Sequence, residues 1–473
     1  SMAGGRALVC MKHVGLNVAA DPFFSSSYVG LEAGLVVVSA DDPGMHSSQN
    51  EQDNRNYARF ARVPVLEPSD SGEAKEFMVA AYELSERFDT PVMFRTTTRT
   101  SHSKSLVTMG ERVETEPVTE VRRDWNKYLM MPQNAIARHR IVEQRARDVA
   151  EYAETCPFNR VEMGDTRVGI ITSGAIYGYA REALPDASYL KLGMTYPLPA
   201  KLIADFRSKV DKLYVVEELD PFLEEAVRLL GVKVDGGKEL NTLLGELDAR
   251  SVARSLASAG VPGVNPDLLG DLAPQAADLP GRPPTFCPGC SHRGLFMVLK
   301  KLRVFVSGDI GCYTMGALPP YSAVHCSTCM GASISMAHGM SKVLEPPAAD
   351  AKPDLRKKVV GVIGDSTFFH SGITSLMNVA YNGGKTLSII VDNSTTAMTG
   401  GQENPGTGKT LLGEPSAVVD VPALCAALGI KRVTTIDPYD MAETERVLRE
   451  ELAADEASVV IAKAPCVLQF KIR

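Results

Sequence analysis

Short runs of apolar residues alternate along most of the chain with stretches of helical periodicity. Residues 34–40 (GLVVVSA) and 90–96 (TPVMFRT) are typical of buried strands, and residues 74–88 (AKEFMVAAYELSERF) between them carry apolar side chains at helical spacing. Strand-like runs recur at 166–174, 212–218, 304–308, 359–364, 387–393 and 458–464. Because strands that alternate with helices form βαβ units, the sequence predicts an α/β protein built from doubly wound parallel sheets.

Breaks in this alternation divide the chain into three expected α/β domains. Residues 258–285 are rich in Pro, Gly and Asp and lack apolar periodicity, so they are typical of a linker. We expect the first domain at 1–115, a solvated linker helix region at 116–165, the second domain at 166–247, a linker at 248–285 and the third domain at 286–473.

Composition and charge exclude some classes of partner. A net charge of −7 argues against a surface for nucleic acid or anionic lipid. No apolar run approaches the roughly 18 residues that span a bilayer, and the first residues lack the pattern of a signal peptide, so we expect a cytoplasmic protein. Nine cysteines, including two Cys-x-x-Cys pairs, then indicate metal or redox chemistry rather than disulfides.

Two oxygen-bearing side chains follow neighbouring strands of the third domain. Asp365 follows VVGVIG and Asn393 follows LSIIVD, with 26 residues between Ser366 and Asn393, enough for one crossover helix and the return strand. Carboxyl ends of parallel strands meet at one edge, and Mg²⁺ prefers oxygen ligands that it shares with a diphosphate. We therefore predict Mg²⁺ and a diphosphate here. Alternatively, Asp365 caps the next helix and Asn393 closes a turn.

The Gly364-Asp365-Ser366 pattern with its distant asparagine resembles the signature of thiamine-diphosphate enzymes. Over nearly its whole length, the chain resembles the large (α) subunits of indolepyruvate ferredoxin oxidoreductases, a 2-oxoacid:ferredoxin oxidoreductase family. The matching segments are 11–22 (MKHVGLNVAADP), 41–55 (DDPGMHSSQNEQDNR), 286–294 (FCPGCSHRG), 308–320 (GDIGCYTMGALPP) and 364–372 (GDSTFFHSG). The resemblance implies that the three domains are pyrimidine-binding, transketolase-C-like and diphosphate-binding.

The same resemblance implies a cofactor and a reaction. Asp365, Asn393 and the backbone carbonyl of Thr395 would bind Mg²⁺, while Gly311, Gly364, Asp365, Ser366, Asn393 and Thr395 would bind thiamine diphosphate. The implied reaction is oxidative decarboxylation of an arylpyruvate, such as indolepyruvate or phenylpyruvate, with coenzyme A, giving an aryl-acetyl-CoA and CO₂. Electrons would pass to ferredoxin, and a smaller β subunit would complete a dimer of α–β pairs.

The cysteines allow two ligand sets. The resemblance implies that Cys287, Cys290, Cys312 and Cys466 hold a 4Fe-4S cluster. The rival set is a structural zinc site of Cys287, Cys290, Cys326 and Cys329, but the 35 residues between its two pairs are more than a common zinc ribbon has. Otherwise Cys326 and Cys329 are buried cysteines at a helix start near the cofactor, and Cys10, Cys156 and Cys425 are core or surface thiols.

Three further residues are candidates for substrate chemistry. Arg99 lies in RTTTRTSHS (95–103), which resembles the segment whose arginine binds the substrate carboxylate in related enzymes, and a guanidinium fits a carboxylate in two parallel hydrogen bonds. Arg95 is equally well explained as a surface salt-bridge partner. His13 follows the first strand and would face the reacting carbon, and His292 follows the Cys-Pro-Gly-Cys pair; each is equally open to a structural role.

Some family features are expected outside these residues, and other functions stay open. In the family, an activating glutamate precedes the strand at 6–12, and a ferredoxin-like domain with two more clusters follows the diphosphate domain. Either a longer polypeptide carries them, or the cluster passes electrons to another subunit. A non-oxidative thiamine-dependent decarboxylase and an inactive scaffold are the alternative functions. Glu217 and Glu218 are expected to make interdomain contacts without a catalytic role.

Overall fold

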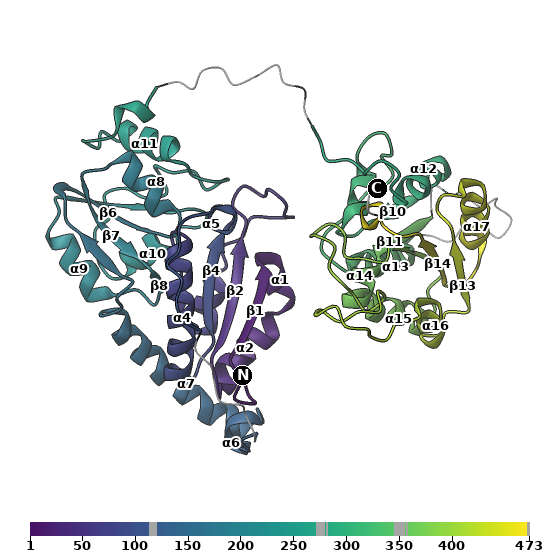
Figure 1. Ribbon diagram of the computed structural model, residues 1–473, viewed down its shortest axis with the longest axis horizontal. Coiled ribbons are helices and arrows are strands. Elements are labelled where there is room, and N and C mark those ends of the chain that lie inside the picture. The colour runs from purple at the N-terminus through teal and green to yellow at the C-terminus, as the bar shows by residue number, and fades with distance from the viewer. Residues whose placement is uncertain (113–120, 271–279, 281, 345–354, 356–357, 471–473) are drawn as a thin grey trace. The chain divides into compact units, whose positions relative to one another are not determined.

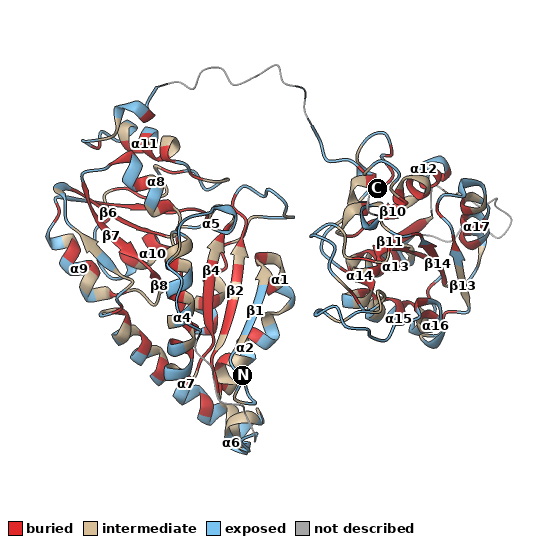
Figure 2. Cartoon of the chain, viewed as in Figure 1, coloured by how far each residue is buried: buried red, intermediate tan, exposed pale blue. Residues whose placement is uncertain are grey.

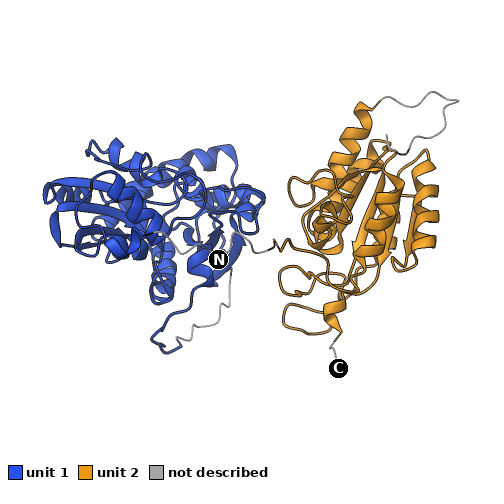
Figure 3. Ribbon diagram, turned by 90° about the horizontal axis from the view of Figure 1, so that it is seen from above, with its two compact units in different colours: residues 1–275 blue, residues 276–473 orange. Residues whose placement is uncertain are grey.

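The computed structural model describes residues 1–112, 121–270, 280, 282–344, 355 and 358–470. The chain divides into two compact units, residues 1–275 and 276–473 (Figure 3). The first unit contains two sheets and the second unit contains one, and helices flank each sheet (Figure 1). The expected α/β class is therefore confirmed. Among the described residues, no helix has the length and apolarity needed to cross a membrane.

The first sheet has the strand order β1-β2-β4-β3-β8. Its strands are β1 (Ala7–Lys12), β2 (Leu35–Asp41), β3 (Val65–Leu66), β4 (Val92–Thr97) and β8 (Met194–Tyr196). The neighbours β1, β2, β4 and β3 pair in parallel, and β8 pairs antiparallel with β3. The helices of this part are α1 (His13–Val18), α2 (Ala20–Val29), α3 (Arg55–Ala61), α4 (Ser71–Phe88) and α5 (Thr98–His102).

The helix α7 (Pro132–Ala153), preceded by the short α6 (Trp125–Tyr128), is not a solvated linker as expected. It packs against α2 and α4 of the first sheet, and its buried stripe includes two arginines. Arg138 donates from Nε to the Tyr28 carbonyl at 2.7 Å, and Arg145 donates to the Asp89 carbonyl at 2.6 Å. The high charge of this segment was misleading because these two arginines are buried and donate to backbone carbonyls.

The second sheet has the order β5-β7-β6-β9 and lies in the same unit. Its strands are β5 (Arg160–Glu162), β6 (Asp165–Ser173), β7 (Ala187–Leu192) and β9 (Lys212–Val216), and its helices are α8 (Ile176–Ala183), α9 (Ala200–Ser208), α10 (Phe222–Leu229) and α11 (Ala249–Ser258). The expectation that the linker begins at residue 248 is wrong, because α11 lies there. Asp248 caps this helix, and its residues Val252 and Leu256 are fully buried in the apolar core of the second sheet.

The third sheet is entirely parallel, in the order β10-β11-β12-β14-β13. Its strands are β10 (Phe305–Ser307), β11 (Val359–Gly364), β12 (Leu387–Asp392), β13 (Arg432–Ile436) and β14 (Ser458–Lys463), and its main helices are α12 (His292–Leu302), α13 (Ala332–Val343), α15 (Ile373–Tyr381), α16 (Val421–Ala427) and α17 (Met441–Ala453). The central strands β11 and β12 are buried along their whole length (Figure 2). Separate apolar cores cover the two faces, as in a doubly wound fold.

Candidate active site

A hollow of about 130 Å³ lies at the carboxyl ends of β11 and β12. Gly364 pairs with Val391 in the ladder, so the residues that follow the two strands come out side by side. We call this space the Asp365 hollow. It is lined by His292, Ile310, Gly311, Cys312, Tyr313, Met330, Gly364, Asp365, Ser366, Thr367, Val391, Asn393, Thr395, Thr396, Ala397, Met398 and Thr399. All six predicted cofactor-binding residues are among them.

Asp365 and Asn393 are both buried at the Asp365 hollow. The Asp365 carboxylate accepts a hydrogen bond from the Ser366 N–H at 2.8 Å and a longer one from Asn404 Nδ2 at 3.4 Å. Burial nevertheless raises the pKa of Asp365 to about 6, and the nearby Asp392 carboxylate adds to the rise. Among the described residues, Asn393 Oδ1 is buried without a hydrogen-bond partner. The Asn393 oxygen therefore does not close a turn. The Asp365 carboxylate and the Asn393 side-chain oxygen both lie at the Asp365 hollow, and burying such oxygens without full hydrogen bonding is unfavourable.

The loop after Asn393 folds back over the end of β11. Thr396 Oγ1 donates to Ser366 Oγ at 3.0 Å, and the Thr396 N–H donates to the Gln402 carbonyl at 2.9 Å. This return brings Asn404, only 8% exposed, to the Asp365 carboxylate. Sequence reasoning did not single out Thr396 or Asn404, because only the return path of the loop brings them to the site.

Two glycines let an aromatic ring approach the backbone of the Asp365 hollow. A Cβ on Gly311 would lie 2.5 Å from Cε1 of Tyr313, and one on Gly364 would lie 2.6 Å from the same atom. Tyr313 is held in this position because its hydroxyl donates to the Ile310 carbonyl at 2.9 Å. Larger residues at either glycine would displace the ring and change the wall of the hollow.

His292 begins α12 and lies against Tyr313 and Phe286, with ring centroids 6.3 Å and 5.9 Å away. The side chain is buried, and burial lowers the pKa of His292 to about 4. Its imidazole is therefore neutral at pH 7. The structure places this predicted residue on the Asp365 hollow as an uncharged group.

The four cysteines of the predicted cluster lie close together in the second unit. The pKa of the Cys312 thiol is raised to about 11, mainly by burial and then by the sulfurs of Cys290, Cys466 and Cys287. The Cys466 N–H donates to the Asn393 carbonyl at 2.9 Å, and Cys312 lines the Asp365 hollow. Among the described residues, no three His, Cys, Asp or Glu side chains stand in metal-ligand geometry. The thiols are therefore neighbours, not preformed ligands.

The other cysteine pair lies beside β10. The Cys326 carbonyl accepts from the Gly308 N–H at 2.8 Å, and the Cys329 carbonyl accepts from the Ala332 N–H at 3.2 Å at the start of α13. The fully buried Asp309 fixes this start by accepting N–H groups of Gly331 and Ser333. Cys329 is exposed and Cys326 partly exposed, so the expectation that both are buried is wrong.

Arg99 and His13 lie in the first unit, at the carboxyl edge of the first sheet. Arg99 follows β4, and its guanidinium donates to both carboxylate oxygens of Glu246, at 2.9 Å and 2.6 Å. His13 follows β1 and is fully buried, with Nε2 3.1 Å from the Asn50 carbonyl oxygen. The structure thus gives Arg99 the bidentate carboxylate geometry expected of it, but with a partner from its own chain.

Arg95 is not a surface residue. It is 4% exposed and forms ion pairs with Asp41 and Glu67 under the edge of the first sheet. Glu217, from the end of β9, lies 3.1 Å from Arg55 of α3, so the predicted contact between the first and second sheets is confirmed. The pKa of Glu217 is raised to about 7 by burial.

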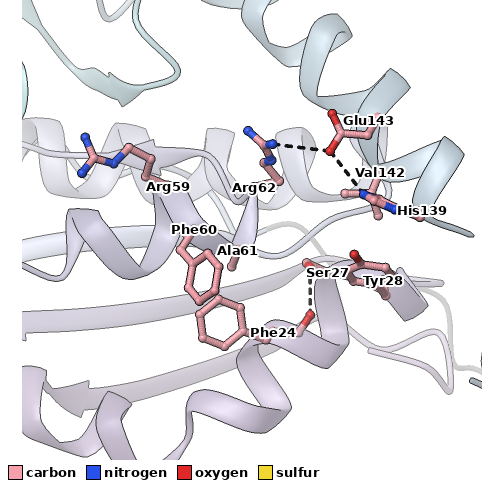
Figure 4. Close-up of a pocket in the computed structure, with 10 residues that line it drawn as sticks. All are labelled: Phe24, Ser27, Tyr28, Arg59, Phe60, Ala61, Arg62, His139, Val142 and Glu143. Carbon is pink, nitrogen blue, oxygen red and sulfur yellow. Dashed lines mark hydrogen bonds and ion pairs between the residues drawn. The ribbon is translucent and has the colours of Figure 1, made fainter. Parts of the chain in front are cut away.

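A larger hollow of about 480 Å³ lies elsewhere, between α2, α3 and α7 (Figure 4). Its polar side chains already have partners, including the Arg62–Glu143 ion pair at 3.5 Å and Arg59, which donates to Asn56 at 2.8 Å. The rings of Phe24 and Phe60, which also line it, lie edge-on with their centroids 4.8 Å apart (Figure 4). Size alone does not identify the site, because this hollow brings together no unsatisfied buried groups.

The chain is similar to known proteins in two respects. Residues 309–462, which include every lining residue of the Asp365 hollow except His292, match the model of the thiamine pyrophosphate enzyme family's C-terminal TPP binding domain. The fold and the site thus define a member of the thiamine-diphosphate enzymes. The chain is 38% identical to the indolepyruvate oxidoreductase subunit IorA of Archaeoglobus fulgidus, over 99% of this chain and 76% of that protein.

Similar relatives are the IorA subunits of Thermococcus kodakarensis, 39% identical, and Methanothermobacter marburgensis, 40% identical; the matches cover 99% and 98% of this chain and 76% of each relative. The chain belongs to the indolepyruvate oxidoreductase subunit IorA family. A solved 2-oxoglutarate:ferredoxin oxidoreductase from Magnetococcus marinus matches 40% of this chain and 67% of its own, with 20% identity and a TM-score of 0.34, which adds nothing to the assignment.

Proposed function

We propose that this chain is the thiamine-diphosphate-dependent subunit of an arylpyruvate:ferredoxin oxidoreductase. An arylpyruvate, coenzyme A and two oxidised ferredoxins would give an aryl-acetyl-CoA, CO₂, one proton and two reduced ferredoxins. The observation that carries this proposal is the buried pair of Asp365 and the unpartnered Asn393 Oδ1 within the matched TPP binding domain. The near full-length similarity to indolepyruvate oxidoreductase subunits supports the substrate class.

The residues of the Asp365 hollow fit a magnesium diphosphate. Asp365, Asn393 and the Thr395 carbonyl would hold Mg²⁺, whose charge would offset the burial that now raises the pKa of Asp365. Thiamine diphosphate, when bound, supplies the electron sink for decarboxylation. The Thr396–Ser366 hydrogen bond keeps the loop folded over this end of the sheet, and His292 presents a neutral imidazole rather than a cation.

The cysteines favour the oxidative reaction over simple decarboxylation. Cys287, Cys290, Cys312 and Cys466 have the donor chemistry of a 4Fe-4S cluster, which would accept single electrons. The Cys466 N–H donates to the Asn393 carbonyl. This backbone hydrogen bond keeps Cys466, one of the four cysteines, next to Asn393, one of the proposed Mg²⁺ ligands. A non-oxidative decarboxylase or an inactive scaffold would have no use for four thiols beside the Asp365 hollow.

The partners follow from the same proposal. Relatives named as subunits support a second, smaller β subunit, and the reaction requires coenzyme A and ferredoxin or another one-electron acceptor. A dimer of α–β pairs in the cytoplasm is the assembly we propose. Arg99 and His13 are further residues that we propose for substrate binding, Arg99 by binding the carboxylate in two parallel hydrogen bonds.

The decisive experiment is removal of the Asp365 carboxylate. Asp365→Ala is expected to weaken retention of thiamine diphosphate by more than about 100-fold, because even outer-sphere partners of a metal contribute 10- to 100-fold. Bound thiamine would be measured after gel filtration without added cofactor. The control is Asp455→Ala, an exposed aspartate that pairs with Lys385 at 2.6 Å and does not line the Asp365 hollow. Full cofactor retention by Asp365→Ala would refute the Mg²⁺ assignment.

A further inference from the structure

The Asp365 hollow combines a polar floor with exposed methionines. Its floor carries Asp365 and Asn393, whereas Met398 and Met330, which also line it, are 54% and 42% exposed. Water beside a long apolar side chain is unfavourable, and the ordinary place for methionine is a core. Two such side chains on one small cavity that also carries a buried carboxylate therefore indicate a group that covers them when the site is filled.

The backbone that carries Met398 is fixed, although its side chain is not packed. The Gly400 N–H donates to the Ala397 carbonyl at 3.2 Å and the Gly401 N–H to the Thr396 carbonyl at 3.1 Å, closing a turn around Met398. Positive φ angles of 122° and 83° at these two glycines explain why the turn needs them.

The same turn is tied to the polar floor. Thr399 Oγ1 donates to Gln402 Oε1 at 2.6 Å, and Thr396 is bonded to Ser366, the residue next to Asp365. A fixed backbone with a half-exposed side chain is the arrangement of a binding residue, because the side chain can adjust to a ligand without moving the loop.

We infer that Met398 is the specificity-determining residue for the substrate side chain, and that with Met330 it selects an aromatic ring. The inference rests on the proposed function and adds to it the residue that distinguishes arylpyruvates from pyruvate. An aromatic ring buries the thioether surface and makes favourable sulfur contacts, and the unbranched methionine side chain adapts to rings of different size. The methyl group of pyruvate leaves Met398 in water and gains neither contribution.

The first test compares substrates on the complex of this chain with its partner subunit, prepared without oxygen and loaded with cofactors. Met398→Ala is expected to lower the ratio of kcat/KM for indolepyruvate to that for pyruvate about 10-fold, mainly through KM, the size of effect that apolar pocket contacts produce. Met398→Leu restores most of the apolar surface and is expected to stay within about 3-fold of the native ratio. Met377→Ala is the matched control, since Met377 is 50% exposed on α15 but does not line the Asp365 hollow.

The second test measures binding without turnover. Indole-3-lactate keeps the ring and carboxylate but has no keto group, and its Kd from isothermal titration is expected to weaken about 10-fold in Met398→Ala. Bound thiamine should be unchanged. Loss of thiamine in this variant, or an unchanged substrate ratio and Kd, would overturn the inference while the proposed function stands. If none of the 2-oxoacids tested supports ferredoxin reduction by the native complex, the proposed function fails and the inference fails with it.

Discussion

At the scale of single residues, Arg99, which we propose as the residue that binds the substrate carboxylate, forms an ion pair with Glu246. Glu246 occupies both donors of the Arg99 fork, and His46 Nε2 lies 2.9 Å from the same carboxylate. The Arg99 side chain is 56% exposed, whereas that of Glu246 is only 15% exposed, and a bidentate pair of this kind is stronger than an ordinary surface ion pair. Under the proposed function, a substrate carboxylate would compete with Glu246 for this guanidinium.

Two substitutions separate the roles of this pair. Glu246→Gln is expected to lower KM for indolepyruvate roughly 2- to 5-fold with kcat unchanged, because the substrate no longer competes with a carboxylate. Arg99→Lys is expected to raise KM about 10-fold, since a point charge cannot replace the planar fork. Steady-state ferredoxin reduction measures both. If Glu246→Gln raises KM as Arg99→Lys does, Glu246 positions the arginine instead of competing for it.

Prediction from sequence succeeded where a residue's position follows from its own strand. Asp365 and Asn393 end strands that the apolar runs define, and both line the hollow. The prediction that Arg95 lies at the surface was wrong. Its partners, Asp41 and Glu67, come from the ends of other strands, 54 and 28 residues away in the chain. Pairs of this kind depend on the strand order, which local patterns do not contain.

At the scale of elements, several carboxylates are buried at the interface between the first and second sheets, among them Glu217 and Glu218. We call this interface the joint. Glu218 follows β9, is 6% exposed and accepts the Leu247 N–H at 2.8 Å. Burial raises the pKa of Glu218 to about 7, a rise that Leu247, Arg95 and Lys238 oppose and that Glu246 increases. The folded protein therefore holds this proton up to a higher pH than the unfolded chain does.

This joint should show a pH-dependent stability. Because the folded pKa of about 7 lies above the usual 4.5, the cost of burying Glu218 grows as pH rises from 4.5 to 7 and is complete above that range. Glu218→Gln keeps an oxygen for the Leu247 N–H, and should raise stability by about 3 kcal/mol at pH 8 and by less than about 1 kcal/mol at pH 5. Thermal unfolding midpoints at both pH values measure this.

The control for the joint is Glu239→Gln, an exposed glutamate of the same segment. Its midpoint should equal the native one at both pH values. An equal gain from Glu218→Gln at pH 5 and pH 8 would show that the carboxylate is not protonated in the folded state, contrary to the expected linkage.

Elements were predictable where their own periodicity is strong. The long helix α4 and the strands β11, β12 and β14 match the expected positions closely. The three-residue strands β5 and β8 are too short to give a pattern, and β8 joins the first sheet although it lies within the expected second domain. The helix α11 has buried apolar residues at helical spacing, but its position beside a Pro- and Gly-rich segment favoured the linker interpretation.

At the scale of the whole molecule, folding of the second unit brings distant parts of the chain together. Cys287 and Cys290 precede α12, Cys312 follows β10, and Cys466 follows the last strand of the sheet. The Tyr439 hydroxyl donates to the Gly289 carbonyl at 2.9 Å and helps to hold the first pair near the segment between β13 and α17. A ligand set that spans the unit in this way requires the complete fold, whereas a set of Cys287, Cys290, Cys326 and Cys329 requires only its first part.

The metal content of cysteine variants distinguishes these sets. Anaerobically purified protein is expected to contain about four irons per chain, and Cys466→Ser and Cys312→Ser should lose the low-temperature EPR signal of the reduced cluster. Cys329→Ser should keep both iron and signal, because Cys329 is exposed at the start of α13. Zinc in place of iron, lost in Cys329→Ser and kept in Cys466→Ser, would instead establish a structural site. The thiols beside the Asp365 hollow would then have no part in electron transfer, and non-oxidative decarboxylation would become the better account of the same thiamine site.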